Sequence, residues 1–99
     1  SSETKDGSLW EPTLNKFEDK PAHVQVTINT THDWYQKTIG ANKNNGDLVK
    51  SYELMLYALA QSEMNNVDED FFPVFEDFRI NVSKNLRKLS EVLPEPDDD

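Results

Sequence analysis

The chain has 99 residues, a formal net charge of -9 and an apolar fraction of 35%. Its length suffices for one small domain, and its 19 acidic against 10 basic residues repel a phosphate backbone, which argues against direct nucleic-acid binding. Cysteine is absent, so disulfides and thiol chemistry are excluded. The sequence has no run near the roughly 20 apolar residues of a membrane span and starts with no secretory leader, so we expect a cytoplasmic protein that does not enter a membrane.

Residues 1–22 are polar and interrupted by prolines, yet they include several large apolar side chains between Leu9 and Phe17. Two interpretations stay open. The segment is either a mobile terminus with incidental aromatic residues or a polar arm whose apolar residues dock on the domain, in the form of a strand. We treat residues 1–22 as an arm and residues 23–93 as a single small domain.

The segment 23–29 has the pattern of a half-buried strand, because Val24, Val26 and Ile28 alternate with polar residues. A strand needs a partner to be stable. Within this chain the candidate partner is the segment Leu9–Phe17. Otherwise the partner lies on another chain or on a further part of a longer protein.

The residues that follow predict a short helix over about 31–39. Thr30 or Thr31 is suited to the N-cap and Asp33 to the first turn, because a short side-chain oxygen can accept hydrogen bonds from the free amides there. Gly40 is then expected as the left-handed residue that ends the helix. The sequence ANKNNG after it predicts a loop.

A first long helix is predicted over residues 47–65, with Asp47 as its cap. Residues 54–60 are apolar nearly all round, so we expect this helix to be covered on more than one side and to be the central element. Its main apolar stripe consists of Leu48, Tyr52, Met55, Leu56 and Leu59.

A second long helix is predicted over residues 70–93. Asp68 or Asp70 can cap it, and Pro73 is tolerated in its first turn because an N–H is not needed there. Further prolines end the helix, and residues 94–99 are expected to form an acidic disordered tail. The apolar positions recur every three or four residues: Phe71, Phe75, Phe78, Val82, Leu86, Leu89 and Leu93.

Together these elements predict an α+β fold that is mainly α. An N-terminal arm and one or two strands are followed by a short helix and by two longer antiparallel helices. The loop of about five residues between the long helices is typical of antiparallel neighbours.

The residues do not form a recognisable catalytic, metal or cofactor site. His23 and His32 are nine positions apart and lack the spacing of metal ligands. His32 beside Asp33 suggests a hydrolase hypothesis, but no Ser or Cys stands in a nucleophile setting, and a capping or hydrogen-bonding role for His32 is the simpler interpretation. The three glycines are isolated, so a phosphate-binding loop is excluded.

Two features are suited to protein binding. The apolar stripe of the last helix either packs in the core or pairs with a helix of another chain, since its spacing is nearly heptad. The candidate interface residues are Phe75, Phe78, Val82, Leu86 and Leu89. An acidic cluster either caps helices and faces solvent or forms a functional acidic surface; it comprises Glu63, Asp68, Glu69, Asp70, Glu76 and Asp77.

Three short motifs of the chain resemble segments of a known family. The motifs are V-x-V-T-I-N-T-T-H-x-W-Y, L-x-L-Y-A-L-A-Q-S-E and F-R-x-x-V-S-x-N-L-R-K-L, within residues 23–91. Their order resembles the C-terminal region of bacterial and phage proteins that carry the ATPase domain of gyrase, Hsp90, histidine kinases and MutL (the GHKL class). The chain departs from that pattern at Asp33, where proline is usual, and at Trp34, where phenylalanine is usual, and it lacks the ATP-binding motifs.

The resemblance implies a structural role for the strand 23–29, which would join an ATPase part to a helical tail. It implies that the residues Asn29, His32, Trp34 and Tyr35 belong to this junction, and it implies no catalysis by them. We therefore expect a non-enzymatic protein-interaction or dimerisation domain, an accessory part of a GHKL-related protein, which binds a protein partner or itself. The alternative is a stand-alone acidic inhibitor, phage-encoded, that imitates nucleic acid toward a nucleic-acid-binding protein.

Overall fold

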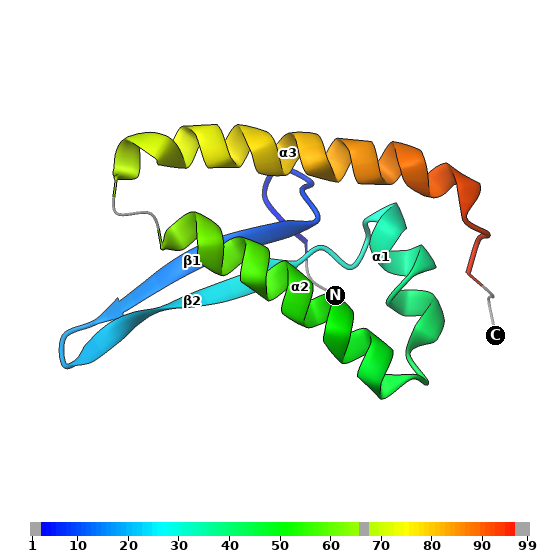
Figure 1. The fold of residues 1–99 in the computed structure, drawn as a ribbon, viewed down its shortest axis with the longest axis horizontal. Coiled ribbons are helices and arrows are strands. Elements are labelled where there is room, and N and C mark those ends of the chain that lie inside the picture. The colour runs from blue at the N-terminus through cyan, green and yellow to red at the C-terminus, as the bar shows by residue number, and fades with distance from the viewer. Residues whose placement is uncertain (1–2, 66–67, 97–99) are drawn as a thin grey trace.

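The computed structural model describes residues 3–65 and 68–96 and has the mainly helical α+β fold that the sequence predicts. Asp97–Asp99 of the expected tail lie outside the described residues. The described residues form three α-helices and a pair of strands (Figure 1), with two short 3-10 turns between the helices and a third after α3. In chain order the elements are β1 (Trp10–Phe17), β2 (Lys20–Ile28), α1 (Asp33–Lys37), η1 (Gly40–Asn42), α2 (Gly46–Met64), η2 (Glu69–Phe71), α3 (Phe72–Leu89) and η3 (Ser90–Val92).

The two strands form an antiparallel hairpin, so the predicted strand and its predicted partner are both confirmed. Trp10 lies opposite Ile28 and Leu14 lies opposite Val24, with an irregularity toward the turn. Alternate side chains of a strand share one face. On this face Trp10 and Val24 are buried, and Leu14, Val26 and Ile28 pack against them. Because α2 covers the same face, the hairpin and α2 enclose the main core.

The residue just before β1 and the first residue of β1 pack deep in the domain. Leu9 and Trp10 are among the most deeply buried side chains of the protein, at 0% and 2% exposure. The main chain of Leu9 contacts two distant elements, since its carbonyl oxygen accepts from the Asn29 N–H at 2.8 Å and its N–H donates to the Ser83 hydroxyl at 2.8 Å. Residues 8–10 therefore connect the hairpin to α3.

The short helix α1 is shorter than predicted, and its ends differ from the prediction. His32 rather than a threonine is its N-cap. Gly40 is not a left-handed residue; it begins η1 instead, and among the described glycines the positive φ is at Gly7, with φ 77. The chain continues directly into η1 instead, where the Asn42 N–H donates to the Ile39 carbonyl at 3.1 Å and the Asn42 side-chain amide donates to the Thr38 carbonyl at 2.6 Å.

Helix α2 is buried on one side, so the expectation that it is covered on several sides is wrong. Asn45 caps it in place of the predicted Asp47, by accepting from the Leu48 N–H at 3.1 Å. Leu56 and Ala60 face the core, whereas large apolar side chains on the other sides stay exposed: Leu54, Met55, Tyr57 and Leu59. A hairpin of two strands is too narrow to cover more than one face of a helix of this length.

Helix α3 lies along one long side of the molecule (Figure 1). The helices α2 and α3 run in opposite directions, are close together near the segment that joins them, and diverge toward the other end. The segment that leads into β1 and the helix α1 lie between them, and α3 contacts α1 as well as α2. None of the helices in the described ranges is long and apolar enough to cross a membrane.

Candidate functional site

The side of α3 that faces the domain includes buried polar residues as well as apolar ones. Arg79 and Ser83, one turn apart, and Ser90 near the end are buried. An arginine is almost never fully buried without a partner. The packing of α3 is therefore specified by hydrogen bonds as well as by apolar contact, and we call the residues that make them the polar seam: Leu9, Trp10, His32, Glu63, Arg79 and Ser83.

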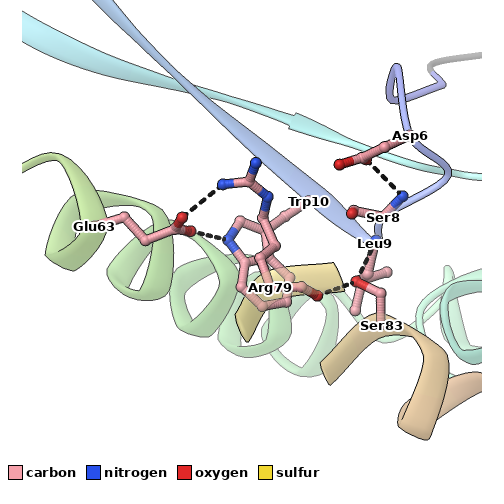
Figure 2. A network of polar contacts seen from close by, with 7 residues as sticks. All are labelled: Asp6, Ser8, Leu9, Trp10, Glu63, Arg79 and Ser83. Atoms are coloured by element: carbon pink, nitrogen blue, oxygen red, sulfur yellow. Dashed lines mark hydrogen bonds and ion pairs between the residues drawn. The ribbon is translucent and has the colours of Figure 1, made fainter. Parts of the chain in front are cut away.

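One half of the polar seam is an ion pair that joins α2 to α3 beneath β1 (Figure 2). The Glu63 carboxylate accepts from Arg79 Nη1 at 2.6 Å and from the Trp10 indole Nε1–H at 2.8 Å. Burial raises the pKa of the Glu63 carboxyl above its ordinary value, while the contacts with Trp10 and Arg79 lower it and offset part of this effect. Every one of these three side chains is buried, so the group forms a structural link and not an open site.

The other half of the polar seam is centred on Ser83. Its hydroxyl accepts from the Leu9 N–H at 2.8 Å and donates to the Arg79 carbonyl oxygen at 2.8 Å, as Figure 2 shows. The Ser83 carbonyl oxygen in turn lies 2.8 Å from Nε2 of His32. A single residue of α3 thus contacts both the N-terminal segment and the residue that begins α1.

His32 is enclosed, at 1% exposure, and both of its ring nitrogens are engaged. Nδ1 accepts from the Trp34 N–H at 3.0 Å, so the proton is on Nε2, which donates to the Ser83 carbonyl oxygen. Burial lowers the pKa of His32, although the contact with Ser83 and the nearby Asp33 favour its protonation. His32 is the general base of the hydrolase hypothesis, but neither of its ring nitrogens is free to take a proton from a substrate. Asp33 is an exposed residue of the first turn of α1.

The structure brings the predicted junction residues Asn29, His32 and Trp34 together where β2 leads into α1. Asn29 is buried, and its Oδ1 accepts from the Thr31 N–H at 3.0 Å and from the Thr31 hydroxyl at 2.6 Å. Its Nδ2 donates to the Gly7 carbonyl at 3.3 Å.

The aromatic residues of the junction complete this arrangement. Trp34 and Tyr35 are half-buried, and Trp34 meets the ring of Tyr52 edge-on with centroids 5.4 Å apart. The junction residues thus fix the chain path between strand and helix and contact α2.

Exposed apolar side chains lie along one flank of α3 and on the short turns at its two ends, η2 and η3. These large side chains are Phe71, Val74, Phe78, Leu89 and Val92, with exposures of 49%, 60%, 62%, 67% and 88%. We call these five residues the outer face of α3. Because the polar seam orients α3, it also determines that these residues point outward.

The outer face overlaps only in part with the interface predicted from the sequence. Phe78 and Leu89 belong to both. Phe75 is half-buried, and Val82 and Leu86 pack against the core, so the domain itself already covers them in part. Sequence reasoning missed the exposure of Phe71, Val74 and Val92. The sequence does contain the polar set Arg79, Ser83 and Ser90 at helical spacing beside the apolar stripe, but it does not show that this set faces the domain.

Two hollows adjoin the exposed apolar residues. A hollow of about 140 Å³ lies between α2 and α3 over Trp10, and Leu59, Phe75 and Phe78 are at its walls. A more open groove of about 420 Å³ lies between β2 and α2, where Leu54, Tyr57 and the side chains of Val24, Val26 and Ile28 line it. The first hollow is continuous with the outer face of α3 through Phe78.

The acidic cluster is mostly a surface feature, with one correction. Glu63 is buried in the polar seam and is not part of an acidic surface. The other predicted members are exposed: Asp68, Glu69, Asp70, Glu76 and Asp77. The C-terminal half of α3 has the opposite charge, since Lys84, Arg87 and Lys88 are exposed there and no acidic residue lies between Phe78 and Ser90.

Within residues 3–65 and 68–96, no group of three or more His, Cys, Asp or Glu side chains is arranged to hold a metal ion. Comparison of the chain with protein-family models, with curated proteins and with solved structures found no match. The geometry and the sequence motifs therefore provide the argument on function.

Proposed function

We propose that this domain is a non-enzymatic protein-interaction module that binds through the outer face of α3. The observation that carries the proposal is the exposure of five large apolar side chains, at 49% to 88%, along one side of a helix. Groups of exposed large apolar side chains bordered by polar residues are typical of protein-binding sites. Two of the five are phenylalanines, and large rings that become buried contribute strongly to binding.

The polar seam supports this proposal, because it makes the orientation of α3 specific. If the helix packed by apolar contact alone, rotating it would bury more of its apolar stripe. The Glu63–Arg79 ion pair and the Ser83 contacts prevent this rotation, since a rotated helix would leave buried charges and a buried N–H without partners. The protein thus keeps apolar residues exposed at the expense of a larger core, which is the arrangement expected of a binding surface.

We also propose that the domain is part of a larger GHKL-related protein. The three motifs shared with GHKL-related proteins support a role as an accessory domain in such a protein. The position of Asn29 and His32 between the hairpin and α1 agrees with the junction that the resemblance implies.

A site-specific crosslinker tests the binding surface directly. A photoreactive amino acid at Phe78 should crosslink to protein in the native cell, whereas the same amino acid at Leu54, which is similarly exposed on α2, should not. Val74→Asp combined with the photoreactive residue at 78 should abolish the crosslink. If position 54 crosslinks and position 78 does not, the interface is the groove between β2 and α2, and the proposal fails.

A second candidate function is the acidic inhibitor that imitates nucleic acid. The specific observation in its favour is the exposure of all five carboxylates between residues 68 and 77, a range that contains no basic residue. The discriminating variant replaces Asp70, Glu76 and Asp77 with their amides. This variant should lose binding to a basic partner if the carboxylates carry recognition, and should keep the crosslink at position 78 if the apolar residues do.

A further inference from the structure

We propose that the outer face of α3 binds the same face of a second copy of this chain, with the two α3 helices antiparallel. This inference rests on the proposed function and names the partner. It is carried by the charge distribution along α3, by the positions of the exposed apolar residues, and by the exposed asparagines between them.

The charges along α3 are self-complementary in one orientation. Residues 68–77 contain five exposed carboxylates and no basic residue, and residues 84–88 contain three exposed basic side chains and no acidic one. Two parallel helices would place the carboxylates of one copy beside those of the other. Two antiparallel helices place the acidic half of each copy beside the basic half of its partner, at both ends of the contact.

The exposed apolar residues fit the same orientation. They occupy both ends of the surface, with Phe71, Val74 and Phe78 at one end and Leu89 and Val92 at the other. If the two-fold axis passes near Asn81, Phe71 of one copy lies opposite Val92 of the other and Val74 lies opposite Leu89. Each end then buries aromatic and aliphatic side chains against one another, and Asp77, which borders the outer face, comes near Lys88 of the second copy.

The middle of the surface contains Asn81 and Asn85, both exposed. Alternating intervals of three and four residues, the spacing of a coiled-coil contact, separate Phe71, Val74, Phe78, Asn81 and Asn85. Asparagine residues within a coiled-coil contact can fix the register of the two helices. The helix α3 is about 27 Å long at 1.5 Å per residue, so the two copies can meet along a continuous line with two-fold symmetry.

The net charge of the chain opposes this contact most strongly at low ionic strength. Two copies of charge -9 repel each other, but this repulsion is screened beyond about 8 Å at physiological ionic strength. The dimer should therefore be at least as stable in moderate salt as in low salt, in contrast to a complex formed with a basic partner.

Disulfide crosslinking can measure the orientation, because the natural chain has no cysteine. Val74→Cys and Leu89→Cys are prepared separately in the full chain, with tags of different size, and are oxidised alone and as a mixture. The antiparallel arrangement predicts a mixed disulfide between the two variants and little crosslinking of either one alone. A parallel dimer would crosslink each variant with itself, and this result would overturn the proposal.

Sedimentation measures the association itself. The natural chain should be dimeric at micromolar concentration, and Phe78→Asp should make it monomeric. Leu54→Asp serves as the matched control, because it changes a similarly exposed apolar residue on α2 and should leave the dimer intact. Val92 is 88% exposed, so Val92→Asp should also make the chain monomeric and replaces Phe78→Asp if the latter disturbs folding.

The outcomes separate this inference from the proposed function. A natural chain that stays monomeric at high concentration overturns the dimer. If the photoreactive residue at 78 then still captures a different protein, and Val74→Asp abolishes this capture, the proposed function stands with another partner. If position 78 captures no protein and the chain is monomeric, both proposals fail.

Discussion

Glu63 and Arg79 form an ion pair at 2.6 Å that is almost closed to solvent, and the indole N–H of Trp10 donates to the same carboxylate. Withdrawing two charges from water is costly, so such a pair contributes little net stability compared with apolar residues of the same shape. Removing one partner is different, because it leaves an uncompensated buried charge. The pair is therefore better understood as a device that fixes the orientation of α3 on α2.

Arg79→Met should lower the free energy of unfolding by about 3–5 kcal/mol at pH 7, because the buried Glu63 carboxyl loses its ion-pair partner. The double variant Glu63→Gln, Arg79→Met should recover most of this loss, since the amide oxygen still accepts from Trp10 and no buried charge remains. Urea unfolding of the three proteins measures both effects. Equal stability of the single and double variants would show that the charge of Glu63 is not the cause.

Because His32 is buried, the folded chain should become less stable at mildly acidic pH. Its pKa in the folded chain is lowered from the ordinary value of 6.5, chiefly by burial and also by Arg87, while the contact with Ser83 and the charge of Asp33 act in the opposite direction. As the pH falls below about 6.5, the unfolded chain therefore takes up a proton that the folded chain does not. Protonation would also place a hydrogen on Nδ1, which accepts from the Trp34 N–H.

The free energy of unfolding should therefore fall by up to about 1.4 kcal/mol per pH unit below this pH through His32 alone. His32→Asn should be less stable at pH 7 but should lack this part of the slope, because asparagine does not titrate. His23→Asn, on the exposed part of β2, is the matched control. Thermal unfolding from pH 7.5 to pH 5 makes the comparison, and identical slopes for the natural chain and His32→Asn would contradict the assignment.

Ser83→Ala should lower the free energy of unfolding by about 1–3 kcal/mol, because the buried Leu9 N–H loses its acceptor. Ser62→Ala is the matched control. Ser62 also donates to the carbonyl four residues earlier at 2.8 Å, but it is exposed on α2, so its replacement should change stability by no more than about 0.5 kcal/mol. If both variants cost the same, the contact across 74 residues of sequence does not contribute to stability.

The elements of this fold could be predicted because each follows from a local pattern. The alternation of Val24, Val26 and Ile28 gives β2, and the intervals of three and four along residues 71–93 give α3. Helix ends were less accurate, since several residues near each end can serve as caps. In the structure Asn45 caps α2 in place of the predicted Asp47, and His32 caps α1 in place of a threonine.

The orientation of α3 could not be predicted because it depends on distant residues. A helical pattern shows that apolar residues share a side, but it does not show which side faces the domain. Here the Leu9 N–H and the Glu63 carboxylate require polar partners, and Ser83 and Arg79 supply them, with separations of 74 and 16 positions in the sequence. Glu63 was assigned to the surface for the same reason, as nothing near it in the sequence indicates its buried partners.

Val82 and Phe78, one turn apart on α3, provide the last prediction. Val82 packs against the core, whereas Phe78 is 62% exposed on the outer face. Val82→Asp should destabilise the chain by more than about 2 kcal/mol, because it brings a charge without a partner into an apolar contact. Phe78→Asp should change the free energy of unfolding by no more than about 0.5 kcal/mol when measured on the monomer. Urea unfolding at low protein concentration tests both; a larger loss for Phe78→Asp than for Val82→Asp would mean that α3 is rotated relative to this structure, and that the apolar stripe and not the polar seam faces the domain.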